Sequence, residues 1–415
     1  MVQGTNIVSI DPSGEKTVLK IQGVNWGGME NTDGVPRGLA FGQANIDTIA
    51  TQLIEDGFNA VRLSISAMGV VLNTPSNIRT FVDPLINPTI GGAKTYINML
   101  QAVVQSLGKS QIGVVLDIRK LDPSFPAGGG ETLWFSDEFS IADFDEALVT
   151  LAQSLCSNNY WNIIGIDLKN EPIGGCWPGA TGECSGTLNW QAAASRFSSI
   201  LLSECPSWLV FVQGLADRNL ELIGTNSVRY FYDDWRGSSL SSAATDPVVI
   251  PDFPNKVVYS PHFYSPSVFP STYFFVESNF STGAFQEFTS SQNATLQSNM
   301  NSVMDRAFGD ISGNAPVVIG EFGGIFGKAD IGAAKTSTRA LENIIEYINS
   351  NELSGGFMYS LTPDNLFSFN GVFNPTNGFQ FGLYQNNFEA FNEDYVTGLR
   401  QLSGSGKMPC FDPER

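Results

Sequence analysis

The stretch Ile163-Ile-Gly-Ile-Asp-Leu-Lys-Asn-Glu171 is a short apolar run that ends in an amide and a carboxylate. A run of this length, bounded by turn residues, predicts a strand that is buried on both faces, as in a parallel sheet. Segments with helical periodicity flank it, over residues 143–156 and 190–203. Strand and helix therefore alternate here, and polar side chains stand at the carboxyl end of the strand.

Comparable apolar runs recur along the whole chain and bring the number of predicted strands to eight, at residues 21–26, 60–66, 112–119, 163–171, 208–213, 257–264, 316–321 and 355–361. Amphipathic helices are predicted between them, among others at 46–56, 96–107, 143–156, 190–203 and 336–350. Eight such units in 415 residues predict an α/β fold, a (β/α)₈ TIM barrel, rather than an open doubly wound sheet.

The ends of the chain extend this prediction. Two β-prone runs around the turn Asp11-Pro-Ser-Gly14 predict an N-terminal β-hairpin over residues 5–21, which would cap the lower end of the barrel. No repeat, charged run or linker marks a second domain. We therefore expect one catalytic domain over 1–415, with the barrel at about 20–400, long loops at its top face and a C-terminal tail at 401–415.

Composition excludes several classes of function. With 22 basic and 41 acidic residues the net charge is −19, so the chain should repel phosphate backbones, and no nucleic-acid partner is expected. No apolar run approaches ~18 residues, which predicts no membrane span. His262 is the single histidine, which argues against a metal site built from several imidazoles. We expect no metal and no cofactor, and carboxylates are left as the main acid–base groups.

Five cysteines suggest an oxidising compartment. Cys176 and Cys184 lie in a glycine-rich stretch that a disulfide would clamp, and Cys156 and Cys205 can pair if the strands that follow them are neighbours. Cys410 is left free or paired elsewhere, and five unpaired thiols are the alternative. With the sequons at Asn279 and Asn293 and a charged content of only 15%, this favours a secreted glycoprotein. The first residues show no signal peptide, so we presume that the signal is absent from this chain.

Two of the strand-end polar residues are carboxylates, Glu171 and Glu321, at the ends of the fourth and seventh runs. Barrels of this class collect function at the carboxyl ends of their strands. Paired carboxylates that face one cleft are what cleavage of a glycosidic bond requires, provided that the environment separates their pKa values. The other strand-end residues are Asn25, Trp26, Arg62, Asp117, Arg119, Asn170, Gln213, His262, Tyr264 and Tyr359.

Asn170-Glu171-Pro172 and Gly320-Glu321-Phe-Gly-Gly324 resemble the signature of glycoside hydrolase family 5, the large cellulase family. Further segments match in the same order and are similar to the endo-β-1,4-glucanase branch: Gly23-Val-Asn-Trp-Gly-Gly28, Arg62-Leu-Ser64, Leu116-Asp117, Phe211-Val-Gln-Gly214, Tyr259-Ser-Pro-His-Phe-Tyr264 and Pro363-Asp364. The resemblance covers roughly residues 20 to 400.

This resemblance implies a role for each matching residue. Glu171 would be the general acid/base and Glu321 the nucleophile of a retaining double displacement. Arg62 and Tyr264 would orient Glu321, Asn170 would bind the sugar 2-hydroxyl, and His262 would line the cleavage subsite.

Three positions depart from the family pattern. Arg119 and Lys169 stand where histidines are usual, and Tyr359 stands where a tryptophan forms the floor of the sugar site. If Arg119 lies near Glu171, its permanent charge would weaken proton donation by that acid. These changes favour an unusual substrate or reduced activity.

Aromatic residues in the predicted top loops form a second candidate set, because sugar rings stack on aromatic faces. Its members are Trp26, Trp134, Trp177, Trp235 and Tyr273. We expect Trp134, Trp177 and Trp235, in loops rich in glycine and serine, to bind substrate.

The expected function is that of a secreted, monomeric retaining hydrolase that cleaves internal β-1,4 bonds of cellulose-like glucan, with a polysaccharide or oligosaccharide as its partner. Mannan, mixed-linkage glucan or a glycolipid glycan is an alternative substrate. A catalytically impaired barrel that binds carbohydrate is a different class of function. A metal-dependent barrel hydrolase is a third, against which the scarcity of histidine argues.

Overall fold

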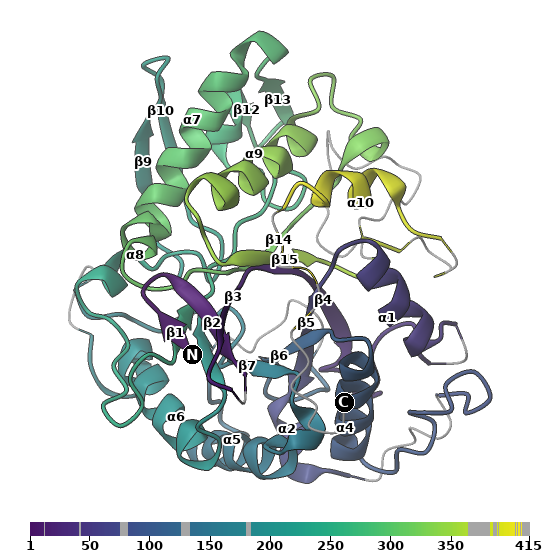
Figure 1. Cartoon of the computed structure of the whole chain (residues 1–415). Coiled ribbons are helices and arrows are strands. Elements are labelled where there is room, and N and C mark those ends of the chain that lie inside the picture. The colour runs from purple at the N-terminus through teal and green to yellow at the C-terminus, as the bar shows by residue number, and fades with distance from the viewer. Residues whose placement is uncertain are drawn as a thin grey trace.

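The structure is a computed structural model that describes residues 1–11, 13–40, 43–74, 82–125, 133–179, 184–363, 382–384, 388, 390–402, 404, 406 and 408. The labels of helices and strands are those of Figure 1. Of the segments named above, Asp364 and Cys410 lie outside these residues, as does most of the tail at 401–415.

Eight parallel strands form the central sheet, in the order β11-β8-β7-β6-β5-β4-β15-β14. They are β4 (Ile21–Met29), β5 (Ala60–Ser66), β6 (Gly113–Lys120), β7 (Ile163–Asp167), β8 (Leu209–Val212), β11 (Val257–Tyr259), β14 (Ile319–Gly323) and β15 (Gly355–Tyr359). Parallel bridges Tyr259–Val317 and His262–Glu321 join the two ends of this sheet and close the ring. The predicted (β/α)₈ barrel is confirmed (Figure 1).

Helices surround the ring and cover its outer face (Figure 1). They are α1 (Ile46–Glu55), α2 (Ala67–Leu72), α4 (Tyr96–Lys109), α5 (Ile141–Leu155), α6 (Trp190–Glu204), α7 (Asn293–Met304), α8 (Asp310–Ser312), α9 (Thr336–Ser350) and α10 (Glu393–Leu399). The five predicted helices are confirmed to within two residues at each end. Local signals explain the starts, because Asn45, Thr95, Ser140 and Asn189 each cap a helix through the side chain.

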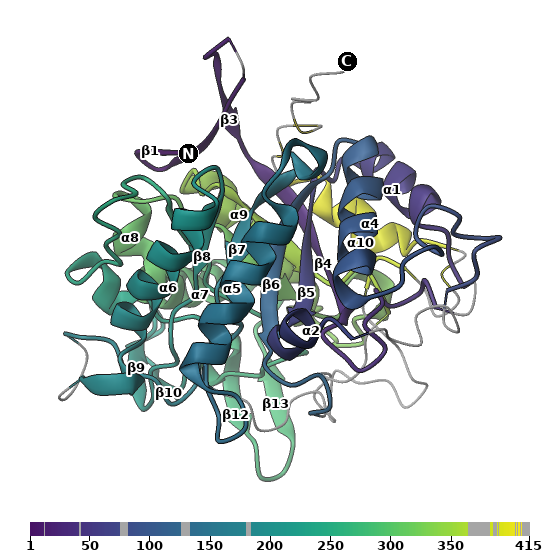
Figure 2. The same ribbon diagram turned by 90° about the horizontal axis from the view of Figure 1, so that it is seen from below.

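The lower end of the barrel is closed by an apolar plug. The strands β1 (Val2–Gln3), β2 (Asn6–Ile10) and β3 (Lys16–Leu19) form an antiparallel sheet there, in which Ile7 pairs with Leu19. Both side chains pack with Val115 and Phe357 from the barrel interior. Figure 2 shows this hairpin at the end of the molecule where the barrel strands begin. The predicted cap is therefore confirmed.

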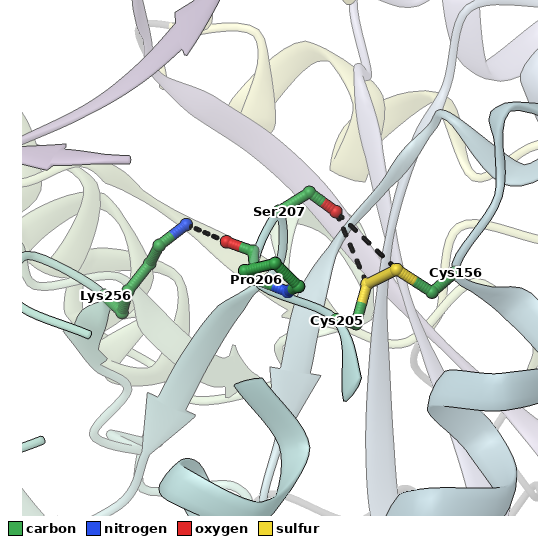
Figure 3. Close-up of a disulfide and its surroundings, with 5 residues drawn as sticks. All are labelled: Cys156, Cys205, Pro206, Ser207 and Lys256. Atoms are coloured by element: carbon green, nitrogen blue, oxygen red, sulfur yellow. Dashed lines mark hydrogen bonds between the residues drawn. A yellow bond between two sulfur atoms is a disulfide. The ribbon is translucent and has the colours of Figure 1, made fainter. Parts of the chain in front are cut away.

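Both predicted disulfides form. Cys156 ends α5 and Cys205 ends α6, and their bond closes a loop of 49 residues beside the neighbouring strands β7 and β8. Ser207 contacts both sulfurs, and Lys256 donates to the Pro206 carbonyl beside them (Figure 3). Loop closure of this length stabilises the fold by about 4 kcal/mol in the chain-entropy model. Cys176 pairs with Cys184 across eight residues in the loop after β7.

Two hairpins extend the upper end of the barrel and were not predicted. The strands β9 (Leu220–Ile223) and β10 (Arg229–Tyr232) follow β8, and β12 (Phe275–Asn279) and β13 (Ala284–Glu287) follow β11. Figure 2 shows both projecting from the end opposite β3. No helix within the described ranges has the length and apolar content that crossing a bilayer requires.

Candidate active site

Arg62 lies at the centre of the site, buried among the ends of the barrel strands. Its Nη1 donates to Glu321 Oε1 at 2.8 Å and to Asn25 Oδ1 at 2.9 Å. Its Nη2 lies 2.9 Å from both Asp117 Oδ1 and Asp167 Oδ2. A guanidinium has five N–H donors in a fixed plane, so this one group holds four strands in register at the site.

Glu321 projects from β14 and is 1% exposed. Nη1 of Arg119 lies 2.6 Å from its Oε1, the oxygen that Arg62 also contacts, and the Tyr264 hydroxyl donates to its Oε2. Burial alone would raise the pKa of Glu321. The charges around it, of which Arg119 contributes most, reverse this effect and hold the pKa well below its ordinary value. Glu321 is therefore an ionised, tightly held carboxylate.

Glu171 follows β7 in a different environment and is 14% exposed. Its Oε1 accepts from Trp235 Nε1 at 2.8 Å and lies 3.1 Å from His262 Nδ1. The backbone is left-handed, with a φ of 46°, which is unfavourable for a residue with a Cβ. The backbone N–H donates to Gln213 Oε1 at 2.8 Å, and this bond helps to hold the strained conformation.

The two glutamates face each other closely. An oxygen of Glu171, an oxygen of Glu321 and a ring nitrogen of His262 all lie within 4.8 Å of one another. Retaining glycosidases place their two carboxyl groups about 5 to 5.5 Å apart, whereas inverting enzymes leave about 6.5 to 9.5 Å for a water molecule. The geometry therefore fits direct attack by one carboxylate.

A buried pair of aspartates supports these groups. Asp167 was not predicted from the sequence, because a carboxylate inside the apolar run 163–168 gives no motif of its own. Its Oδ2 accepts from Arg62 Nε at 3.1 Å and from Gln213 Nε2 at 3.0 Å. Burial is the main influence and raises the pKa of Asp167 to about 6, against the opposing charge of Arg62. Gln213 thus connects Asp167 with the Glu171 backbone.

Arg119 contacts Glu321, whereas we expected it to lie near Glu171. Its guanidinium contacts Glu321 at 2.6 Å and lies over the ring of Tyr359, 5.2 Å from the centroid. Arg119 therefore helps to keep Glu321 ionised, and the expectation that it weakens proton donation by Glu171 stays a prediction. Asn170 Oδ1 accepts from Arg62 at 3.2 Å and from Arg119 at 3.4 Å. Lys169 is buried and donates to the Asn170 carbonyl at 2.8 Å.

Most of the aromatic residues that we expected to bind sugar are buried. Trp26, Trp134, Trp177 and Tyr273 are buried in the hydrophobic core, so sugar rings cannot stack on them. Trp134 packs on Trp190 with ring centroids 4.9 Å apart. The indole N–H groups of Trp26 and Trp177 donate to the backbone carbonyls of Arg37 and Asp246, which satisfies them inside the protein.

Trp235 differs from this group, because it lies at the site and is half-buried. Its indole N–H is used on Glu171, and its ring meets Tyr264 edge-on at 5.1 Å. His262 is fully buried, and its Nδ1 lies against the Glu171 carboxylate.

Glu171, His262 and Glu321 have the spacing of a three-ligand cation site. Two guanidinium groups already neutralise Glu321 at 2.6 and 2.8 Å, and a cation in the same place would be repelled by both. The arrangement therefore favours chemistry carried out by carboxylates alone.

Comparisons with known proteins agree with this geometry. A family model described as Cellulase (glycosyl hydrolase family 5) matches residues 11–365. An endoglucanase of Paenibacillus polymyxa is 29% identical over 365 residues, which cover 87% of this chain and 79% of that protein. The major extracellular endoglucanase of Xanthomonas campestris is 30% identical over 401 residues, which cover 95% of this chain and 70% of that protein.

Solved structures resemble the chain over nearly its whole length. A hyperthermophilic endocellulase from the archaeon Pyrococcus horikoshii has a TM-score of 0.74 and 28% identity, and the match covers 97% of both chains. A complex of an endocellulase from that organism with cellotetraose has a TM-score of 0.72, at 28% identity and the same coverage. The catalytic domain of the major endoglucanase from Xanthomonas campestris has a TM-score of 0.71 at 27% identity, with 97% of this chain and 99% of that chain covered.

Proposed function

The chain belongs to glycosyl hydrolase family 5, the cellulase family, and we propose the following roles for its residues in the cleavage of glucan. It is a glycoside hydrolase that cleaves internal β-1,4-glucosidic bonds of cellulose-like glucan with retention of configuration. The observation that carries our assignment of roles is the pair of carboxylates within 4.8 Å, one held by two arginines and the other by a tryptophan and a histidine.

In the first step, Glu321 attacks the anomeric carbon as a carboxylate and forms a glycosyl ester. The bond from that carbon to the leaving oxygen breaks, and Glu171 in its protonated form gives its proton to this oxygen. Both contacts to the Glu171 carboxyl fall on Oε1, so we assign the transferred proton to Oε2.

In the second step, water attacks the anomeric carbon and Glu171, now ionised, takes its proton. The ester bond to Glu321 breaks, and the carboxylate returns to its two arginines. The Trp235 N–H stabilises the ionised form of Glu171 between the two steps, since a hydrogen bond to a charged acceptor is roughly twice as strong as one to a neutral acceptor.

We assign supporting roles to the surrounding residues. Arg62, Arg119 and Tyr264 keep Glu321 ionised and oriented, and His262 and Gln213 position Glu171. Asn170 and Tyr359 are the residues that we propose to contact the bound sugar, with Tyr359 held beneath Arg119.

We also propose that the protein acts outside the cell as a monomer with a single catalytic domain. A carbohydrate substrate fits the site, and one relative is named as an extracellular endoglucanase. The two disulfides are consistent with an oxidising compartment.

Release of reducing ends tests the proposed function. Wild type should cleave soluble β-1,4-glucan faster than mannan or mixed-linkage glucan and should lower the viscosity of the solution early, as internal cleavage does. Glu321→Gln should abolish both effects. Binding of glucan without turnover of any of these polysaccharides would instead indicate an impaired barrel.

A further inference from the structure

The sequon Asn279-Phe280-Ser281 lies at the tip of the β12–β13 hairpin. Asn279 is the last residue of β12, and Ser281 lies in the turn that leads to β13. Both side chains are exposed, and Figure 2 shows the hairpin projecting from the end of the barrel opposite β3. A triplet of this kind in a surface turn is the acceptor of N-linked glycosylation in secreted proteins.

The side-chain amide of Asn279 is oriented by its own turn. Its Oδ1 accepts from the backbone N–H groups of Ser281 and Thr282, each at 3.1 Å. These two bonds occupy the oxygen, and Nδ2 donates no hydrogen bond within the described part of the chain. An N-linked glycan is bonded to Nδ2, so this turn holds the acceptor atom ready for one.

The second sequon, at Asn293, has different surroundings. Asn293 is the first residue of α7 and is half-buried, and its Oδ1 accepts from Nη1 of Arg339 in α9 at 3.4 Å. Thr295, which completes this sequon, is half-buried as well. The amide of Asn293 therefore contributes to the contact between two helices, and this sequon serves as the comparison for Asn279.

Asn279 also lines a groove between the two upper hairpins, which has a volume of about 780 Å³. Phe231 lines this groove from β10 and is 63% exposed, and Phe280, inside the sequon, is 47% exposed. The ring of Phe280 meets that of Phe285, another lining residue, edge-on at 5.3 Å. Soluble proteins rarely leave neighbouring aromatic rings open to water, so the exposure of these rings indicates that something covers them.

A glycan attached to Asn279 would begin inside this groove. The innermost sugars of an N-linked glycan are N-acetylglucosamines, which are uncharged and have apolar ring faces and hydrogen-bonding edges. Aromatic rings pack against such faces, and Ser278 and Gln286 add polar groups to the lining. The charged residues of the lining, Arg229 and Glu277, have opposite signs, so the groove has no net charge and suits a neutral sugar.

We propose that Asn279 carries an N-linked glycan whose first sugars lie in the groove between the hairpins and cover Phe231 and Phe280. An oligosaccharyltransferase of the secretory pathway catalyses the transfer from a lipid-linked oligosaccharide. Nδ2 of Asn279 attacks the anomeric carbon of this donor, the bond from that carbon to the pyrophosphate oxygen breaks, and Nδ2 loses a proton. The inference rests on the extracellular location proposed above and is independent of the hydrolytic activity.

Peptide mapping of the full chain secreted by yeast tests the attachment. The peptide that contains Asn279 should carry a glycan, and Asn279→Gln should lose the mass of that glycan. Hydrolysis of glucan by Asn279→Gln should stay at the wild-type rate, which separates this test from that of the proposed function. A protein that is secreted with Asn279 unmodified would overturn the proposal and leave the proposed location and activity intact.

Binding of the neutral apolar dye Nile red tests whether the glycan covers the groove. The fluorescence of the dye should rise about two-fold with Asn279→Gln, because two aromatic rings become accessible. Asn293→Gln is the matched control and should stay at the wild-type level, and adding Phe231→Ser to Asn279→Gln should remove most of the rise. Equal fluorescence with wild type and Asn279→Gln, or the same rise with Asn293→Gln, would overturn the proposal.

Discussion

Glu171 and Glu321 are the same residue type at the same end of the same barrel, and both lie near His262, whose Nδ1 is 3.1 Å from Glu171 and 3.7 Å from Glu321, yet their closest partners differ. Glu321 is buried against two guanidinium groups and a phenol, whereas Glu171 is partly exposed and held by an indole and an imidazole. Permanent positive charge keeps Glu321 ionised, whereas no guanidinium donates a hydrogen bond to Glu171 in the described structure. The partners of each glutamate, and not its residue type, therefore divide the two roles.

This division of roles also explains what Arg119 contributes to the site. A second arginine on Glu321 strengthens the contrast between the two carboxylates, since the shortest contact of Arg119 in the site is its 2.6 Å contact with Glu321. The departure from the family pattern thus reinforces a charge that Arg62 already supplies.

The largest effect should come from removing the nucleophile. Glu321→Gln should lower kcat at least ~10⁴-fold on both glucan and activated aryl cellobiosides, because no other carboxylate is placed to form the ester. Steady-state rates on the two substrates measure this, with the exposed Glu138→Gln as control. If this variant kept more than a hundredth of the wild-type rate, the assignment of Glu321 as the nucleophile would be wrong.

Removing the general acid Glu171 should slow the cleavage of glucan much more than the cleavage of an activated aryl cellobioside. Glu171→Gln should lower kcat on glucan by ~10³-fold, in the range of general acid catalysis. Formation of the ester from a dinitrophenyl cellobioside should be nearly unaffected, because that leaving group needs no proton. The rate of the initial burst of dinitrophenol release measures the formation of this ester. An equal loss of the burst and of glucan hydrolysis would contradict the division of roles.

Arg119→Gln should move the acid side of the pH profile. Arg119 lowers the pKa of Glu321, so its removal raises that pKa, and the ionised form is then lost at a higher pH as the solution is acidified. We expect the acid limb of kcat/KM to shift upward by roughly one unit and the rate on that limb to fall about ten-fold.

Arg119→Lys is the matched control, because it keeps the charge beside Glu321 and should leave the limb nearly in place. Faster hydrolysis by Arg119→Gln across the whole pH range would mean that the arginine impairs the site.

The smallest effect should come from Trp235→Phe, which removes one hydrogen bond from Glu171. A hydrogen bond of this kind contributes about 0.5 to 1.5 kcal/mol net, so we expect kcat on glucan to fall about two- to ten-fold. Trp161→Phe, at the lower end of the barrel, should leave the rate unchanged. If Trp235→Phe raised KM alone, the ring would bind sugar, as we expected from the sequence, and would not position Glu171.

The barrel could be predicted from the sequence because its strands are buried on both faces and read as continuous apolar runs. The hairpin strands could not. The strand β9 reads Leu-Glu-Leu-Ile and β12 reads Phe-Val-Glu-Ser-Asn, and both are short and half-exposed within polar loops. Two-stranded sheets of this kind are held by contacts with segments distant in sequence, for example between Thr272 and the Phe231 carbonyl and between Arg306 and Tyr232, and no local pattern predicts such contacts.

The site was predictable where chemistry and strand ends coincide, as for Glu171, Glu321 and Arg62. It was not predictable where a partner decides the role. Asp167 sits inside an apolar run and shows its function only through Arg62. The tryptophans in loops were misjudged because a loop's composition does not say which side packs, and Trp134 packs on Trp190.

The most direct test of the division of roles is to trap the ester. A dinitrophenyl glycoside of 2-fluoro-cellobiose reacts in the first step and is slow in the second, so the enzyme should release one equivalent of dinitrophenol and gain the mass of one fluorocellobiosyl group. Peptide mapping should place this group on Glu321. A label on Glu171, or no adduct while glucan is still cleaved with retention, would contradict the account.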